Sequence, residues 1–399
     1  MRKKSGRKSL RCAGQNPSGG QKGHKGVTLE QVGNPDYVII HTPEKCDACQ
    51  KSLSDVSTST QKGASRQVFD IPEPKVEVTE HRVETKICAC GQVNTGAFPD
   101  DVCAPVQYGK RISALAVYLS IQQLIPEDRL QVTFWDVFGL KISTATLVKI
   151  NEGFATKIGP FMDEVLHRLK LAHVKHLDET GLRIGAKTQW LHVISSNEET
   201  HYRVSPKRGN LLEGLKGILV HDHWKPYFTL KKVKHALCNA HHLRELKARE
   251  EDKEPWAFRM SRLLRVTSGY SKTNVPEAIF LRLTRLYDKI VRQGLAFHES
   301  KQPFSKPARG RRKHRPGHNL LFRLRDFKKE VLRCLRDADV PFTNNQAEQD
   351  IRMMKVKQKI SGSFRTQHGA EVFCVIRGFL STARKQDRNL FASIKLALG

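Results

Sequence analysis

The 399-residue sequence lacks the features that mark membrane and secreted proteins. Its longest uncharged apolar stretch runs from Ile112 to Pro126, which is shorter than the roughly 20 residues that a transmembrane helix needs. The basic opening MRKKSGRKSLRCAGQNPSGG is not followed by the apolar segment of a secretory signal. We therefore expect no membrane contact and a cytoplasmic location.

Acidic residues are also scarce. The sequence has 40 Asp and Glu residues against 69 Lys and Arg residues, which leaves a net charge of +29. An excess of this size predicts a polyanionic partner, and nucleic acid is the first expectation.

The cysteines are nine in number, and an odd count without a signal favours free thiols and metal ligands over disulfides. Cys46 and Cys49 form a C-x-x-C pair, and Cys88 and Cys90 form a C-x-C pair. Four thiolates in two such pairs suit a structural tetrahedral Zn²⁺ ion, whereas the alternative is four unconnected reduced cysteines. Other side chains could replace the fourth ligand: Cys103, His41 and His81.

Composition and periodicity predict a multidomain α/β protein. The stretch VFDIPEPKVEVTEHRVETKICAC alternates apolar and polar residues as strands do. From Gln131 to Ile150 the period is helical, with a turn at Gly139 and an N-cap at Ser143. This pattern fits a DNA-reading helix-turn-helix, or else a plain helical hairpin between domains.

We expect the segments in this order: a basic Gly- and Ser-rich arm at 1–36, a zinc-finger-like DNA-binding β module at 37–105, a helical, helix-turn-helix-like region at 106–165, a catalytic α/β domain at 166–240 and 341–399, and a helical stretch at 241–340 that contains a basic loop at 305–319.

The α/β segment holds two acids at strand ends. Strand-like runs (AHVKHLD, TQWLHVISS, THYRVS, GILVHD and 233–238), with a short helix at 210–216, predict a mixed sheet. Asp178 follows the first run and Asp222 ends the fourth, so both carboxylates would lie at the sheet edge where sites form. Each of them could instead be a turn or cap residue.

A third acid opens a basic helix. The helix beginning near Asn344 places Glu348, Arg352, Lys355 and Lys359 on one face, and we expect the three basic residues to bind DNA. The alternative is a solvated face with an incidental acid at its N-terminus.

Three convergent carboxylates would repel one another unless cations neutralised them. Oxygen ligands of this kind suit Mg²⁺ or Mn²⁺. Two such ions can activate a water molecule or a 3′-hydroxyl for displacement at phosphorus. The sequence therefore predicts an enzyme that acts on phosphodiesters.

A family resemblance joins these features. The chain resembles bacterial DDE transposases of the insertion sequence sixty-six family over nearly all of its length. The matching motifs, in order, are GGQKGHKG, the paired cysteines, YGKRISALAVYLSIQQLIPEDRL with FGLKISTATL, LDETGLRI, HDHWKPY, CNAHHLREL and NNQAEQDIRMMKVKQKISGSF.

The resemblance implies an RNase H-like catalytic core with a helical insertion, in which Asp178, Asp222 and Glu348 form the acidic triad. It also implies cleavage at the terminal inverted repeats of the element and joining of the 3′-hydroxyls to target DNA. The expected partners are further copies of the chain, in a homo-oligomer on DNA, and small accessory proteins of the element, in association with the nucleoid. The N-terminal coiled coil that is common in the family is not visible in this sequence.

Two other functions fit the same residues. One is a decayed, zinc-containing DNA-binding repressor of the element, and the other is an RNase H-like nuclease that only hydrolyses. The motif with Cys238, His241 and His242 could bind a metal, or its helix could pack Cys238 inward and turn the histidines and Arg244 toward DNA or the acids.

Overall fold

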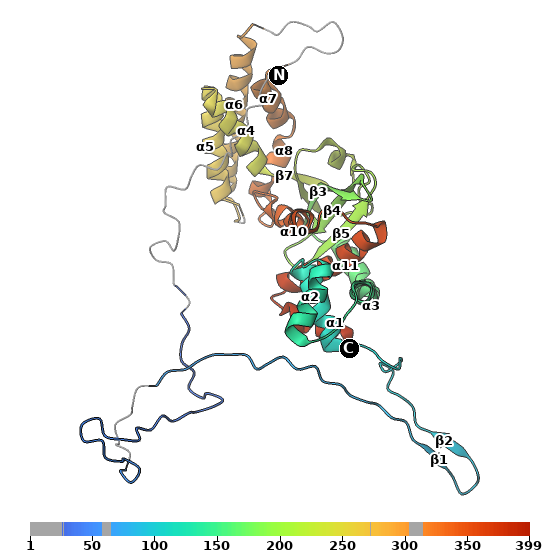
Figure 1. The fold of residues 1–399 in the computed structure, drawn as a ribbon. Helices are drawn as coiled ribbons and strands as arrows, with labels where there is room; N and C mark the ends of the chain where they lie inside the picture. The colour runs from blue at the N-terminus through green and yellow to red at the C-terminus, as the bar shows by residue number, and fades with distance from the viewer. Residues whose placement is uncertain (1–25, 27, 58–64, 272, 303–313) are drawn as a thin grey trace, which may run out of the picture. The chain divides into compact units, whose positions relative to one another are not determined.

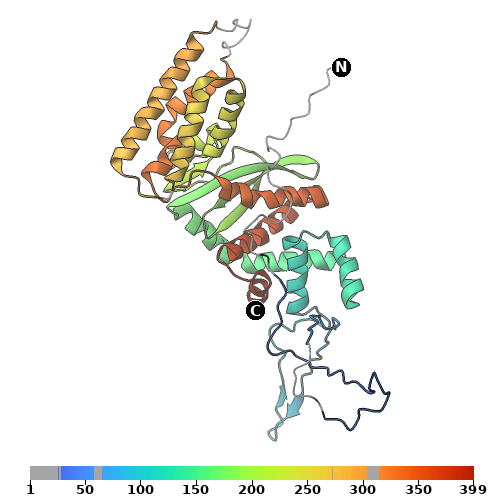
Figure 2. The same ribbon diagram turned by 90° about the vertical axis from the view of Figure 1, so that its left-hand side faces the viewer.

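The computed structural model describes residues 26, 28–57, 65–271, 273–302 and 314–399 (Figures 1 and 2). Most of the arm predicted at 1–36 and most of the basic loop predicted at 305–319 lie outside the described residues. The chain divides into two units, residues 1–74 and 75–399, and each unit is described by itself.

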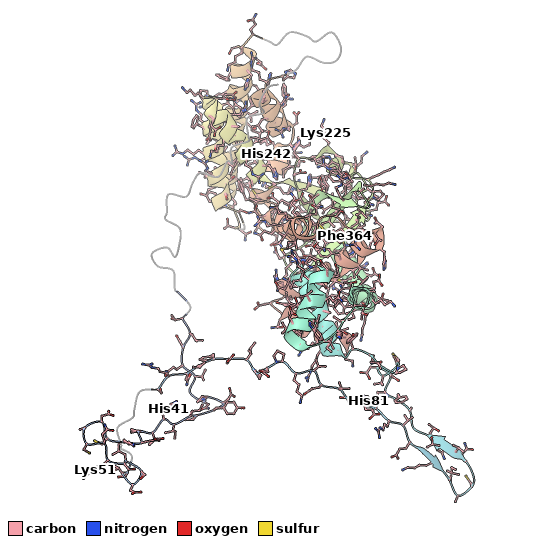
Figure 3. All side chains as sticks on the ribbon, viewed as in Figure 1. His41, Lys51, His81, Lys225, His242 and Phe364 are labelled. Carbon is pink, nitrogen blue, oxygen red and sulfur yellow. The ribbon has the colours of Figure 1, made fainter. Side chains whose placement is uncertain are left out.

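The described part of the first unit is extended and exposed, and it contains a single bridge-closed turn. Lys45 pairs with Ser52 across this turn, and the Cys46 amide donates to the carbonyl of Lys51 at 3.0 Å. Figure 3 marks His41 and Lys51 in this stretch. The turn therefore brings the C-x-x-C pair into one tight loop.

The second unit begins with a short antiparallel hairpin made of β1 (Thr85–Ile87) and β2 (Val93–Thr95). The longer strands predicted upstream are wrong, because no residue of 65–84 is in a strand. Val68 and Val78 alternate with polar residues, but each is 91% exposed. Alternation produces a strand only where a partner strand and a buried face exist.

Three helices follow the hairpin: α1 (Lys110–Val117), α2 (Glu127–Phe138) and α3 (Thr144–Leu171). The predicted turn is confirmed, because Gly139 ends α2 with a left-handed φ of 63°. The predicted N-cap is confirmed as well, since the Ser143 hydroxyl accepts the Thr146 amide at 3.1 Å. The boundary predicted at residue 165 falls inside α3, which continues to Leu171. Helix α3 packs against β5 (Thr200–Ser205) of the sheet described next.

The predicted mixed sheet is confirmed and has five strands: β3 (Val174–Ile184), β4 (Lys187–Ser195), β5 (Thr200–Ser205), β6 (Ile218–His221) and β7 (Lys234–Leu237). Their spatial order is β5-β4-β3-β6-β7. Strands β3, β4 and β5 are antiparallel, whereas β6 and β7 run parallel to β3. The helix predicted at 210–216 is absent. The left-handed φ angles of Gly214 and Gly217, +76° and +78°, are incompatible with helix there.

Three helices form the C-terminal part of the chain: α10 (Asn345–Ser361) and α11 (Gln367–Lys385), which lie against this sheet, and α12 (Leu390–Leu398), which packs on α1 and α3. Helix α10 contacts β3 and β4, whereas α11 packs against β5 and α3. Figure 2 shows these helices, in red, against the green sheet. Beyond α10 the chain returns to β3, where Phe364, labelled in Figure 3, forms a bridge with Ile184.

Among the described residues between β7 and α10 there are six helices: α4 (Asn239–Glu251), α5 (Pro255–Gly269), α6 (Glu277–Glu299), α7 (Pro316–Asp326), α8 (Lys328–Val331) and α9 (Arg333–Arg336). Their apolar core includes Ile218 and Val220 of β6 and Ala236 of β7. The insertion is therefore packed onto the parallel side of the sheet. Within the described residues, we find no helix with the length and apolar character to cross a bilayer.

Candidate active site

Asp178 and Asp222 lie at the same edge of the sheet. Strands β3 and β6 are parallel, and their register sets His176 opposite Val220. Asp178 and Asp222 each follow two residues later, so both lie just past the carboxyl end of the parallel β3–β6 pairing. Asp222 directly follows β6, as predicted. The prediction that Asp178 follows a strand is wrong, because β3 continues to Ile184 through its pairing with β4. The two acids predicted from the sequence are thus brought together by strand pairing.

Glu348 reaches this edge because Asn344 connects the start of α10 to β3. The Asn344 amide side chain donates to the Leu177 carbonyl at 2.8 Å, and its oxygen lies 2.8 Å from Nδ1 of His176. Glu348 follows Asn344 by one helical turn, and the Glu348 amide donates to the Asn344 carbonyl at 3.2 Å. The side chain of Glu348 is 29% exposed.

The far end of α10 is attached to the same strand. Gln358 donates to the carbonyl of Gly181 at 3.4 Å, and the Phe364 amide donates to the carbonyl of Arg183 at 3.0 Å. Helix α10 therefore follows β3 from one end to the other, and this double attachment fixes Glu348 relative to Asp178.

The electrostatics of Asp178 report the proximity of the other acids. Burial, together with the negative charges of Glu179, Asp222 and Glu348, raises the pKa of Asp178 to about 7. The Glu179 amide opposes this shift by donating to Oδ1 of Asp178 at 2.9 Å. The site therefore holds three acids from three separate segments: β3, the loop after β6 and α10.

The motif around Cys238 surrounds Glu348. Cys238 Sγ and His241 Nδ1 lie 3.9 and 3.8 Å from Oε1 of Glu348, and Arg244 Nη2 lies 3.7 Å from Oε2. Cys238 is buried, as expected for the inward-packed alternative, and the side chains of His241 and Arg244 turn toward an acid. His242, labelled in Figure 3, is instead buried and contacts Asn239.

A second cluster beside the acids was not foreseen from the sequence. Glu179, whose side chain is 1% exposed, accepts from Nε of Arg208 at 2.9 Å and from the hydroxyl of Tyr227. Arg208 lies over the rings of Trp190 and Trp224, at 4.9 and 4.3 Å from their centroids. In the sequence, the only indication of this cluster was Glu179 itself, an acid directly after Asp178.

Trp224 also orients Asp222. Its amide donates to Oδ1 of Asp222 at 2.9 Å, and its ring packs edge-on against Tyr227. The Trp224 side chain is partly buried against the apolar cluster that contains Tyr227.

The basic stripe is placed as predicted on α10. Arg352, Lys355 and Lys359 are exposed, and they continue the helix face that begins at Glu348. Their role in binding DNA remains a prediction.

The paired cysteines lie in tight turns, one pair in each unit. Hydrogen bonds from the Cys49 and Ala48 amides lower the pKa of Cys46, and the Cys90 amide does the same for Cys88. Each pair thus has a thiolate favoured by backbone donors, as metal-binding turns do. The four-thiolate zinc site remains a prediction, as do the alternatives at Cys103, His41 and His81.

The structure is that of an α/β domain with acids at the edge of a mixed sheet, helices inserted after the last strand and an exposed basic helix face. The family model described as "Transposase IS66 family" matches residues 105–372. Because this match covers more than half of the chain, the chain belongs to the IS66 family of transposases. Membership implies DNA as a partner, in agreement with the net charge of +29. The comparison with curated proteins found no match.

Proposed function

We propose that the chain is a DNA transposase that binds the ends of its own insertion element, cleaves strands there and joins the 3′-hydroxyl ends to target DNA. Asp178, Asp222 and Glu348 are the proposed catalytic residues on an RNase H-like core. The observation that carries the proposal is geometric: the β3–β6 register sets Asp178 beside Asp222, and the Asn344–Leu177 hydrogen bond holds the start of α10, with Glu348, on β3.

The donor chemistry of the site fits divalent metal. Three carboxylates repel one another unless cations neutralise them, and burial, together with the charges of Glu179, Asp222 and Glu348, raises the pKa of Asp178 to about 7. Asp178, Asp222 and Glu348 would hold Mg²⁺ or Mn²⁺, which prefer oxygen ligands. When bound, such ions supply charge neutralisation at phosphorus and activation of a water or hydroxyl nucleophile.

The surrounding residues have positioning roles in this proposal. Asn344 holds the start of α10 on β3, so that Glu348 faces the two aspartates. Trp224 fixes the orientation of Asp222 through its amide. Arg352, Lys355 and Lys359 extend from the site along α10 and would hold the DNA backbone by contacts with phosphates.

Binding of the element ends is proposed for the parts before the sheet domain. The α2–α3 pair supports a helix-turn-helix, because its turn and cap are those of two helices joined by a short connection. The cysteine turns would bind structural Zn²⁺. A homo-oligomer of the chain on DNA and accessory proteins of the element belong to the same proposal.

The test uses the DNA that flanks the reading frame, with its inverted repeats, as substrate in Mg²⁺. Asp222→Ala should abolish strand cleavage and leave binding nearly unchanged. Asp163→Ala, a matched change at an exposed position of α3, should cleave as the unmodified chain does. Cleavage by Asp222→Ala would show that the catalytic assignment is wrong.

Two further outcomes separate the alternatives. A chain that binds the repeats in a salt-sensitive way without cutting them in any divalent metal is a repressor. A chain that cuts but fails to join a pre-cut 3′-end to a second duplex is a hydrolytic nuclease. Joining of the pre-cut end supports the transposase.

A further inference from the structure

The thiol of Cys238, the imidazole of His241 and the carboxylate of Glu348 form a cluster of mixed donors. One ligand atom from each residue lies within 4.8 Å of the others. Cys238 precedes the first residue of α4, and His241 is in the first turn of that helix. The short C-x-x-H spacing on α4 and the attachment of α10 to β3 therefore direct all three groups to one point.

The distances are close to those of a metal site. Two ligands of a tetrahedral Zn²⁺ ion, each bound at about 2.0–2.3 Å, lie about 3.5 Å apart. Oε1 of Glu348 is 3.9 Å from Sγ of Cys238 and 3.8 Å from Nδ1 of His241. Contraction by a few tenths of an ångström would bring Glu348 to both donors, and Sγ of Cys238 lies within 4.8 Å of Nδ1 of His241. Side-chain rotation can bring the three donors around one ion.

The two donors beside Glu348 are available for such an ion. Among the described residues, Nδ1 of His241 is buried without a hydrogen-bond partner. Sγ of Cys238 accepts the Asn344 amide at 3.1 Å. This hydrogen bond resembles the support that surrounding groups give to metal-ligating side chains.

The donor types select the class of metal. A thiolate and an imidazole are poor ligands for Mg²⁺, which prefers oxygen, and good ligands for Zn²⁺ and Cd²⁺. Three protein ligands with one open position form a common Zn²⁺ arrangement. We propose that Cys238, His241 and Glu348 form a site for a thiophilic divalent cation, separate from the carboxylate site that Asp178 and Asp222 define.

Glu348 is shared between the two sites, and this has a functional consequence that rests on the function proposed above. A Zn²⁺ or Cd²⁺ ion held by Cys238 and His241 would draw the Glu348 carboxylate toward α4 and away from Asp178. Occupancy of the thiophilic site would therefore inhibit strand cleavage.

The direct test measures binding in the full chain, freed of metal with a chelator and titrated with Cd²⁺. The ultraviolet charge-transfer band between thiolate and Cd²⁺ reports each bound cysteine. Cys238→Ser should lose the contribution of one thiolate. Cys374→Ser, which removes another buried cysteine, this one in the apolar packing around α11, should lose none. The other cysteines contribute equally in all these proteins, so the differences isolate Cys238.

His241→Ala gives a second measurement that does not disturb a buried residue, since the His241 side chain is 36% exposed. It should weaken Cd²⁺ binding at this site by about tenfold or more, as loss of one ligand of a small set does. If Cys238→Ser and His241→Ala both titrate as the unmodified chain does, the thiophilic site does not exist. If Cys238→Ser fails to fold, the result for His241→Ala decides.

The inhibition test compares cleavage in Mn²⁺ with and without added Cd²⁺ for each protein. The unmodified chain should be inhibited, and Cys238→Ser should retain a much larger fraction of its own activity. Equal inhibition of both proteins would show that Cd²⁺ does not inhibit cleavage through Cys238. A chain without any cleavage activity would refute the proposed function, whereas the Cd²⁺ titration would still decide the thiophilic site.

Discussion

The side-chain amide of Asn344 donates to the carbonyl of Leu177, the residue directly before Asp178, at 2.8 Å. This hydrogen bond joins two segments that are 167 residues apart in the chain. It connects the helix that carries Glu348 to the strand that carries Asp178, so the distance between these two acids depends on it.

Asn344→Ala should therefore reduce activity more than stability. Loss of two side-chain hydrogen bonds, to Leu177 and His176, should cost about 2 kcal/mol in urea unfolding. Strand cleavage should fall by at least about tenfold, because Glu348 is no longer held opposite Asp178.

Asn389→Ala is the matched control for Asn344→Ala. Asn389 caps α12 by accepting the Ala392 amide at 2.9 Å, and its loss should cost about 1 kcal/mol. Since α12 packs on α1 and α3, cleavage should be unaffected. Equal losses of activity in the two variants would mean that Asn344 acts only through stability.

Asp178→Asn should stabilise the metal-free protein. The raised pKa of Asp178, about 7, means that the folded state binds more protons than the unfolded state between about pH 4 and about pH 7. The free energy of unfolding therefore falls as pH rises through this window. At about pH 8 the amide should add about 2 kcal/mol, and at about pH 4 nothing. Urea unfolding in chelator measures both values.

Asp163→Asn is the control for this effect, since Asp163 is exposed on α3. It should change stability by less than about 0.5 kcal/mol at either pH. If Asp178→Asn and Asp163→Asn behave alike, neither burial nor the neighbouring acids destabilise the charged form of Asp178 in the folded protein.

Lys175 should have the opposite effect at higher pH, where the free energy of unfolding rises with pH because of this residue. Lys175 is fully buried, donates to the carbonyls of Ala172 (2.7 Å) and Lys216, and has a pKa lowered by burial to about 8. Between about pH 8 and about pH 10.4 the folded state binds fewer protons than the unfolded state, so stability rises with pH. The rise attributable to Lys175 is at most about 3 kcal/mol.

Lys175→Met should abolish that rise, which urea unfolding at about pH 7.5 and about pH 10 would detect. Loss of the hydrogen bonds lowers stability at both pH values, so the slope is the diagnostic quantity. Lys289→Met, on the exposed face of α6, should keep the full slope. An unchanged slope in Lys175→Met would mean that this lysine is hydrated in the folded protein.

The parts of the fold that follow from local pattern were predictable from the sequence. The five strands have alternating or apolar runs, and Gly139 and Ser143 mark the ends of α2 and α3 by backbone rules. The predicted strands at 65–84 were wrong because periodicity reports the shape of a segment and not the presence of a partner.

The surroundings of the site were less predictable, because they depend on contacts distant in sequence. Arg208 meets Glu179 from a loop without periodicity, 29 residues away. The double attachment of α10 to β3 likewise has no local signature. The acids themselves were visible because Asp178 and Asp222 come directly after apolar runs and Glu348 is in the first turn of a helix, although the strand of Asp178 continues beyond it to Ile184.

The Glu179–Arg208 pair should show energetic coupling. Arg208→Ala leaves Glu179, with a side chain 1% exposed, without its cation. Breaking a fully buried pair costs about 3–5 kcal/mol, but Arg208 is 40% exposed, so we expect about 2 kcal/mol. In a Glu179→Gln background the same change should cost about 1 kcal/mol less.

Arg336 and Glu277 form the control pair for this double-mutant cycle. Their side chains lie 2.8 Å apart and are 56% and 59% exposed, so their coupling energy should be below about 0.5 kcal/mol. Strict additivity at Glu179 and Arg208 in urea unfolding would show that Glu179 is stabilised by Tyr227 alone.

The basic stripe of α10 can be separated from the catalytic acids by its salt dependence. Each phosphate neutralised by a lysine contributes about 0.9 to the slope of log affinity against log salt concentration. Lys355→Ala should therefore lower this slope by about 0.9 for a duplex of the element end. Fluorescence anisotropy at several salt concentrations gives the slope. Lys289→Ala, an exposed lysine on α6, should leave it unchanged. If the slope is unaltered by loss of Lys355, this lysine does not contact the DNA, because a side chain that neutralises a phosphate releases counterions.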